Sequence, residues 1–135
     1  MDDMIEDVLR GARVIAVVGF SANPARPSHS VSKFLQAKGY RVIPVNPGLA
    51  GQELLGETVY ATLSDIPEPV DMVDVFRASA AVSGVVDAAL EIPSVRVIWT
   101  QLGVRDDAAA ARAEAAGRIV VQDRCPAIEY PRLLG

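Results

Sequence analysis

The sequence predicts an α/β fold in which a doubly wound, five-stranded parallel sheet has helices on both faces, and two observations lead to this prediction. Short runs dense in Val and Ile have the length and continuous apolar character of strands buried on both faces. Segments with apolar residues at helical spacing alternate with these runs, as in parallel sheets. The expected strands are residues 13–18, 41–45, 72–76, 96–99 and 118–121. Because crossovers between parallel strands are right-handed, few topologies remain, and we expect the strand order 3-2-1-4-5.

Helices are expected between these strands and at both ends of the chain. Val31, Phe34 and Leu35 share one helical face, and Gly39 follows as a natural stop. Ser79 is the expected N-cap of the next helix, because its hydroxyl can accept a backbone N–H. The other expected helices are residues 106–116, 4–9 and 127–134. The Gly- and Pro-rich stretch 47–69 is expected to be an irregular connection with short local elements.

The composition is typical of one globular domain covering residues 1–135. Half of the residues are hydrophobic and 22% are charged. The apolar stretches have strand length, well short of the roughly 20 residues of a membrane span, and the first residues lack the features of a secretory signal. The net charge of −4, without a run of Lys or Arg, argues against nucleic acid as a partner. The sequence leaves open whether the chain forms a homo-oligomer.

Polar and glycine residues follow the predicted strands at the points where each strand ends. In an open α/β sheet the ligand crevice lies beyond these carboxyl ends, so the residues that follow the strands are the candidate binding residues. They are Gly19, Phe20, Ser21, Arg26 and Ser28 after the first strand, Asn46 and Pro47 after the second, Phe76 and Arg77 at the third, and Gln101 after the fourth. We expect them to converge on one rim.

The loop after the first strand has the features of a phosphate site. It leads into a helix whose first backbone N–H groups are free to bind an anion. Gly19 permits close approach of the backbone, Ser21 and Ser28 carry hydroxyls, and the Arg26 guanidinium suits a phosphate. The alternative is that the serines cap the turn and Arg26 is solvated.

The dinucleotide fingerprint is incomplete in this loop. Ser21 and Pro24 stand where it requires glycines, and Asn46 stands at the end of the second strand in place of the acid that binds ribose. NAD is therefore disfavoured, and an NAD(P)-binding oxidoreductase or redox regulator remains an alternative function. Pro47 offers a flat apolar face for an adenine, and Phe76 and Arg77 can flank a pyrophosphate. The plainer interpretations are a turn that ends a strand and a core phenylalanine.

Several separated motifs carry a resemblance to a known family. They are Gly19-Phe20-Ser21 with Arg26-Pro27-Ser28, Pro44-Val45-Asn46-Pro47, Asp74-Val75-Phe76-Arg77, Gln101-Leu102-Gly103-Val104 and Asp123-Arg124-Cys125. From about residue 13 to residue 133 the chain resembles the stand-alone CoA-binding protein family, which is similar to the nucleotide-binding domain of the succinyl-CoA synthetase alpha subunit.

The resemblance implies a Rossmann-like fold with coenzyme A lying over the strand ends. It places the phosphates near Ser21, Arg26 and Ser28, the adenosine near Asn46 and Pro47, and the remainder beside Phe76, Arg77 and Gln101. The chain also departs from the family. Ala127, Tyr130 and Leu49 stand where the family or its synthetase relatives have Lys, His and Lys.

The sequence assigns no catalytic or metal-binding residue. The only histidine is His29, and no Gly-x-Ser-x-Gly elbow, Walker loop or cluster of metal ligands is present. Asp71, Asp74 and Asp123 are expected to have solvated or capping roles. The predicted function is binding of CoA or an acyl-CoA without catalytic machinery of its own. An alternative is a non-catalytic partner subunit of an acyl-CoA ligase.

Cys125 is the only cysteine, so no intramolecular disulfide can form, which fits the cytoplasm where we expect the protein. Because Pro126 favours the first position of a helix, the thiol is expected at an N-cap. The plainer interpretation is a half-buried structural cysteine. The alternative hypothesis is a reactive thiol that forms a mixed disulfide with CoA.

Overall fold

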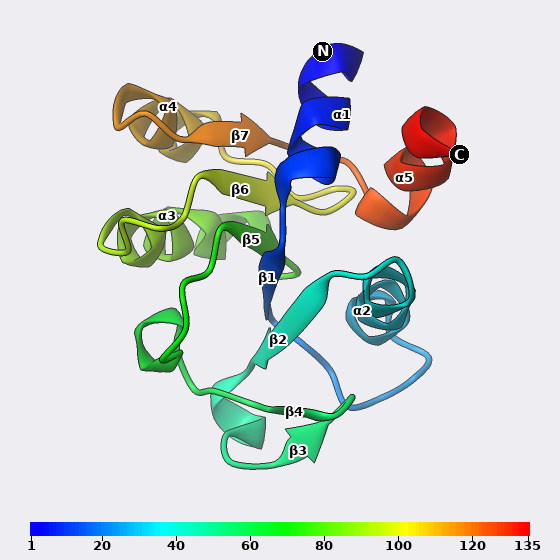
Figure 1. Cartoon of the computed structure of the whole chain (residues 1–135). Coiled ribbons are helices and arrows are strands. Elements are labelled where there is room, and N and C mark those ends of the chain that lie inside the picture. The colour runs from blue at the N-terminus through cyan, green and yellow to red at the C-terminus, as the bar shows by residue number, and fades with distance from the viewer.

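The computed structural model describes residues 1–135 and contains a parallel sheet with helices on both faces (Figure 1). The strands of this sheet are β1 (Val14–Val18), β2 (Arg41–Val45), β5 (Met72–Val75), β6 (Val97–Thr100) and β7 (Ile119–Val121). All neighbouring pairs are parallel. The predicted α/β class with a five-stranded, doubly wound sheet is confirmed, and each strand lies within one residue of its expected bounds.

The strand order 3-2-1-4-5 is wrong. The observed order is β2-β1-β5-β6-β7, so the third predicted strand lies beside the first and not outside the second. The physical reason is the connection after β2, which folds back along the free edge of that strand. Asn46 N donates to Tyr60 O at 2.9 Å, and Tyr60 N donates to Pro44 O at 3.1 Å. That edge is therefore occupied at its carboxyl end.

The start of β5 is held beside β1 by the carboxylate of Asp71. Its oxygens accept the backbone N–H groups of Arg13 and Val14, each at 3.1 Å. Asp71 thus has the capping role expected of it, and it acts between two strands that are distant in sequence. The intervening stretch 47–69 contains the short antiparallel pair β3 (Glu53–Leu54) and β4 (Glu57–Thr58) and two 3₁₀ turns, Pro47–Leu49 and Leu63–Asp65.

Five α-helices form the two layers that cover the sheet. They are α1 (Asp2–Gly11), α2 (Pro27–Ala37), α3 (Val82–Leu90), α4 (Asp107–Ala115) and α5 (Pro126–Leu134). Helices α1, α2 and α5 lie on one face, and α3 and α4 lie on the other (Figure 1). Alternate residues of β5 serve the two layers, since Met72 is buried with α1, α2 and α5 while Val73 and Val75 are buried with α3 and α4. None of the helices combines the length and apolar character needed to cross a membrane.

Ser79 does not cap α3. It begins a 3₁₀ turn, Ser79–Ala81, and Ala81 is the N-cap of the helix. The Ser79 hydroxyl instead accepts the backbone N–H of Arg105 at 2.9 Å. This bond connects the loop after β6 to the segment after β5. A local capping pattern cannot predict such a contact, because the two segments are distant in the sequence.

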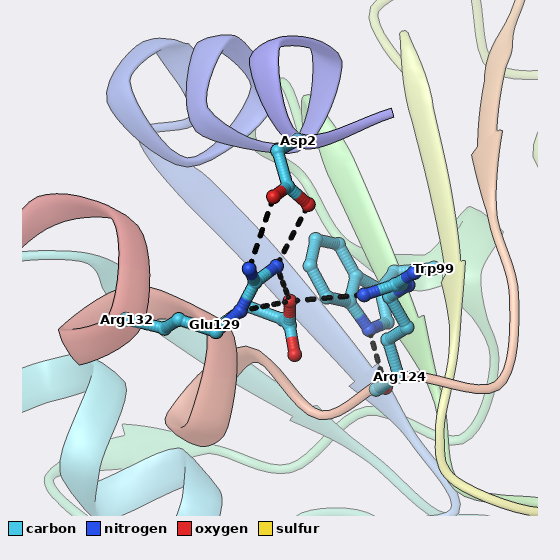
Figure 2. A network of polar contacts seen from close by, with 5 residues as sticks. All are labelled: Asp2, Trp99, Arg124, Glu129 and Arg132. Carbon is cyan, nitrogen blue, oxygen red and sulfur yellow. Dashed lines mark hydrogen bonds and ion pairs between the residues drawn. The ribbon is translucent and has the colours of Figure 1, made fainter.

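A network of polar contacts joins both ends of the chain to the sheet (Figure 2). The side chain of Glu129 on α5 is only 8% exposed, and its Oε1 accepts from Arg124 at 3.2 Å and from Arg132 at 2.6 Å. Arg132 also donates to both carboxylate oxygens of Asp2 at the start of α1. The indole N–H of Trp99 in β6 donates to the main-chain carbonyl of Arg124 at 2.7 Å. The segment before α5 is therefore fixed against the sheet.

The substitution Glu129→Gln tests this network, because it keeps the size of the side chain and removes its charge. We expect the free energy of unfolding to fall by about 1–3 kcal/mol, since two guanidinium groups lose a buried charged acceptor. Urea unfolding followed by circular dichroism measures the change. The control Glu6→Gln removes an exposed ion pair with Arg10 and should cost at most about 0.5 kcal/mol. Equal effects of the two substitutions would contradict the structural role of the network.

Candidate functional site

The carboxyl ends of the strands surround a cavity of about 800 Å³. Its volume lies in the range of small-molecule and cofactor sites. Nine of the ten candidate residues line it: Gly19, Phe20, Ser21, Arg26, Ser28, Asn46, Phe76, Arg77 and Gln101. The tenth, Pro47, lines an adjoining hollow of about 740 Å³ that shares Gly19, Asn46, Gly48 and Arg77 with the first. The convergence of these residues on one rim is therefore as expected.

The cavity lies where the strand order reverses, between β1 and β5. Gly19 follows β1 and Phe76 follows β5, and the two loops touch at this point. Gly19 has a φ of +88°, and a Cβ on it would lie 2.4 Å from the carbonyl oxygen of Phe76. Only glycine allows both this backbone conformation and this approach. The floor of the cavity therefore depends on the absence of a side chain at position 19.

Two of the candidate side chains hold the rim together. The Ser28 hydroxyl accepts the backbone N–H of Ser21 at 2.9 Å. Asn46 donates from Nδ2 to the carbonyl of Phe20 at 2.7 Å, and its Oδ1 accepts from the N–H of Gly48 at 2.8 Å. The side chain of Asn46 thus joins the loops after β1 and β2. The sequence around Asn46 predicts only a turn. These bonds fix the conformation of the backbone that faces the cavity.

The rim is positively charged in a chain whose net charge is −4. Arg26 and Arg77 are exposed and line the cavity, and neither forms an ion pair. No Asp or Glu lines either hollow. The backbone N–H of Ser28, in the first turn of α2, donates to no acceptor within the chain. This arrangement can bind an anion through two guanidinium groups and a helix N-terminus.

The rest of the wall is more apolar than the ten candidate residues alone predict. Leu49, Leu102, Val104 and Cys125 line the cavity in addition to the candidate residues. Leu102 is 57% exposed. Its position in the loop directly after β6 was the sequence signal that could have identified Leu102 as a cavity residue. The side chain of Gln101 is buried, and its Oε1 has no hydrogen-bond partner. The cavity is thus lined by two arginines after the central strands β1 and β5, and by apolar side chains after the flanking strands β2, β6 and β7.

Asp74 is fully buried in the centre of the sheet, beside Val17 and Trp99 of the neighbouring strands. Neither of its carboxyl oxygens has a hydrogen-bond partner. The expectation of a solvated or capping role is therefore wrong for this residue, whereas Asp123 accepts the N–H of Gly103. Burial raises the pKa of the Asp74 carboxyl well above its ordinary value of 3.8 and favours the neutral form.

The fold and the cavity together define a Rossmann-like α/β protein with a ligand-sized cavity at the topological switch point. The chain belongs to the CoA binding domain family, whose profile matches residues 13–131. This finding confirms the resemblance that the motifs at the strand ends predicted.

Several known proteins are similar to this chain. The uncharacterised protein YneT of Bacillus subtilis is 40% identical over 121 residues, covering 90% of this chain and 87% of that protein. A Thermus thermophilus protein of known structure is 40% identical, with a TM-score of 0.93 over 99% of each chain. A dinucleotide forming acetyl-coenzyme A synthetase 1 of Ca. Korarchaeum cryptofilum is 26% identical, with a TM-score of 0.68 over 84% of this chain and 27% of the enzyme. The chain is thus similar to small proteins and to one region of a larger enzyme.

The substitution Gly19→Ala tests the close approach of the two loops. We expect the free energy of unfolding to fall by about 2–3 kcal/mol, because the methyl group meets the Phe76 carbonyl and the positive φ is disfavoured. The control Gly51→Ala has the same φ of +88° with nothing within 4 Å of the added Cβ. It should cost about 1 kcal/mol. Urea unfolding of both variants separates the two contributions, and equal costs would show that the approach at Gly19 is unimportant.

The substitution Asp74→Asn tests the raised pKa. The folded protein keeps a proton that the unfolded chain releases, so the contribution of neutral Asp74 is fully present below pH 3.8 and is lost as the pH rises through the folded pKa. The amide that replaces the carboxyl does not titrate. We therefore expect the stability of the variant, relative to the unaltered protein, to increase with pH from about 4.5 to 8 in urea unfolding. Parallel pH profiles would contradict the buried neutral carboxyl. The control Asp3→Asn removes an exposed carboxyl on α1, and the pH profile of this variant should stay parallel to that of the unaltered protein.

Proposed function

We propose that the protein binds coenzyme A or an acyl-CoA at the carboxyl edge of its sheet, as a binding module without catalytic machinery of its own. The observation that carries this proposal is the pair of unpaired guanidinium groups, Arg26 and Arg77, on a rim without carboxylates. A phosphorylated ligand supplies the anions that this rim lacks. The family to which the chain belongs supports CoA as that ligand.

The phosphates lie near Ser21, Arg26 and Ser28 in this proposal. The free N–H of Ser28 and the positive end of α2 favour negative charge at this position. The adenosine lies near Asn46 and Pro47, where the adjoining hollow has apolar walls. Because the Asn46 side chain is already bonded to Phe20 and Gly48, it shapes the turn, while Pro47 offers a flat surface to the base.

The pantetheine arm of the ligand is expected beside Phe76 and the loop that follows β6. Phe76 and Leu102 offer apolar surface to its methylene and methyl groups. Gln101 also lines the cavity, and the amide groups of the arm can form hydrogen bonds with a polar side chain of this kind. Each part of CoA thus has a matching group on the rim.

NAD fits the rim less well. Its ribose hydroxyls are usually held by a carboxylate after the second strand, and no carboxylate lines either hollow. A second candidate role, as the non-catalytic partner of an acyl-CoA ligase, is favoured by the likeness to one region of the Korarchaeum synthetase. In that case the same rim holds CoA, and a separate chain supplies the chemistry.

Calorimetry with CoA, dephospho-CoA and NAD tests the proposal. We expect CoA to bind most tightly and NAD most weakly, because CoA carries the largest phosphate charge. Arg26→Ala and Arg77→Ala should each weaken CoA binding by about tenfold or more, the loss of one charge-assisted contact. The control Arg96→Ala removes an exposed, unpaired arginine before β6, at the opposite edge of the sheet, and should leave the affinity unchanged.

Two results would contradict the proposal. One is a preference for NAD over CoA, which would favour the oxidoreductase alternative. The other is an equal loss of affinity in Arg96→Ala and the two rim variants, which would show that only the overall charge of the protein attracts the ligand.

A further inference from the structure

The turn that follows β6, residues 101–104, is held in place by hydrogen bonds within it and from another segment; we call it the β6 turn. Within it, the N–H of Val104 donates to the carbonyl of Gln101 at 2.9 Å. The N–H of Gly103 donates to a carboxylate oxygen of Asp123 at 2.6 Å. This second bond comes from the connection between β7 and α5, and it is strengthened by the charge of the acceptor. A residue distant in sequence thus fixes the position of the β6 turn.

Asp123 has a backbone conformation that residues other than glycine rarely adopt. Its φ of +59° lies in the left-handed region. Neighbouring bonds hold this conformation, because the N–H of Asp123 donates to the hydroxyl of Thr100 and the N–H of Arg124 donates to the carbonyl of Thr100, each at 3.2 Å. The carbonyl of Arg124 is bound in turn by the indole of Trp99 (Figure 2). Disfavoured backbone conformations persist where the surrounding structure fixes them, and they cluster at ligand sites.

The β6 turn presents uncharged side chains to the cavity. Gln101, Leu102 and Val104 all line it, and Leu102 is 57% exposed although its side chain is apolar. The two arginines of the rim, Arg26 and Arg77, follow β1 and β5 instead. The phosphates of a ligand are therefore attracted to the loops after those strands, whereas the β6 turn suits an uncharged part. In the ligand that we propose, the uncharged part is the pantetheine arm.

We propose that Asp123 is a positioning residue that holds the β6 turn in place for the arm of the ligand. This inference rests on the proposed function, because the rim must seat the nucleotide half before the arm reaches the turn. Asp123 does not line the cavity, so it acts through the backbone of Gly103 and the neighbouring Leu102. A turn that is ordered before the ligand arrives loses little conformational freedom on binding, which raises the affinity. The affinity for the arm, and not for the nucleotide, therefore depends on Asp123.

Three substitutions separate the hydrogen bond of Asp123 from its charge and from its backbone conformation. Asp123→Ala removes the acceptor and leaves a residue that disfavours the positive φ. Asp123→Gly also removes the acceptor but adopts this φ readily. Asp123→Asn removes the charge, keeps an acceptor oxygen and tolerates the positive φ. Because Asp123 is exposed, we expect all three variants to fold, and circular dichroism checks this.

Calorimetry of each variant compares CoA with its nucleotide half, an ADP that carries the additional ribose phosphate but no pantetheine arm. We expect Asp123→Ala and Asp123→Gly to weaken CoA binding by about fivefold or more, because the β6 turn must then be ordered by the ligand. The affinity for the nucleotide half should not fall, because the β6 turn does not contact it. Asp123→Asn should bind CoA at least as tightly as the unaltered protein, because the turn stays in place and a negative charge near an anionic ligand is removed.

Two controls distinguish positioning from charge and from stability. Asp3→Ala removes an exposed carboxylate on α1 that lines neither hollow, and it should leave both affinities unchanged. In urea unfolding, Asp123→Gly should be at least as stable as Asp123→Ala, because glycine adopts the positive φ without strain. We expect the two variants to bind CoA equally weakly all the same, whereas a merely structural role would make the affinity follow the stability.

The outcomes separate this inference from the proposed function. Unchanged CoA affinity in Asp123→Ala and Asp123→Gly would overturn the inference, while CoA binding itself stands. Equal losses for CoA and for its nucleotide half would also overturn it, because the turn would then not serve the arm. So would a loss in Asp123→Asn as large as that in Asp123→Ala. If the unaltered protein binds neither ligand, both proposals are wrong.

Discussion

The close approach of Gly19 to the carbonyl of Phe76 is the constraint on which the site depends. It brings the loop after β1 into contact with the end of β5 at the point where the strand order reverses. The loop carrying Ser21 and the start of α2 then lies on one side of this contact, and Arg77 lies on the other. A cavity at this place follows from the topology, because the helices after β1 and β5 diverge to opposite faces of the sheet.

The positive charge of the rim depends on which arginines form ion pairs with carboxylates. Arg41 pairs with Glu57 and Glu68, and Arg112 and Arg132 pair with Asp87 and Asp2, all of which are residues outside the lining of the cavity. Arg26 and Arg77 have no such partner. An acidic protein thereby keeps a local cationic site, and the cost of bringing two like charges to one rim is offset when an anion binds between them. The anionic ligand that we propose therefore follows from the distribution of charge, and not from the net charge.

Much of the fold and of the rim could be predicted from the sequence, because strand length, helical spacing and the convergence of parallel strand ends are local or topological rules. The strand order could not, because it depends on hydrogen bonds between Asn46 and Tyr60 along the free edge of β2. The burial of Asp74 was also missed, since a carboxyl among apolar residues is usually solvated. The contribution of Leu102 and Cys125 to the wall depends on how two loops distant in sequence meet.

A nuclear magnetic resonance titration of the isotope-labelled protein with CoA tests whether the rim binds this ligand, because it reports every backbone amide separately. We expect shifts concentrated at Gly19, Ser21, Ser28, Gly48 and Arg77, with the amides at the opposite edge of the sheet, such as Arg96 and Arg118, unchanged. Shifts centred on that opposite edge, or none at a saturating concentration of CoA, would contradict it.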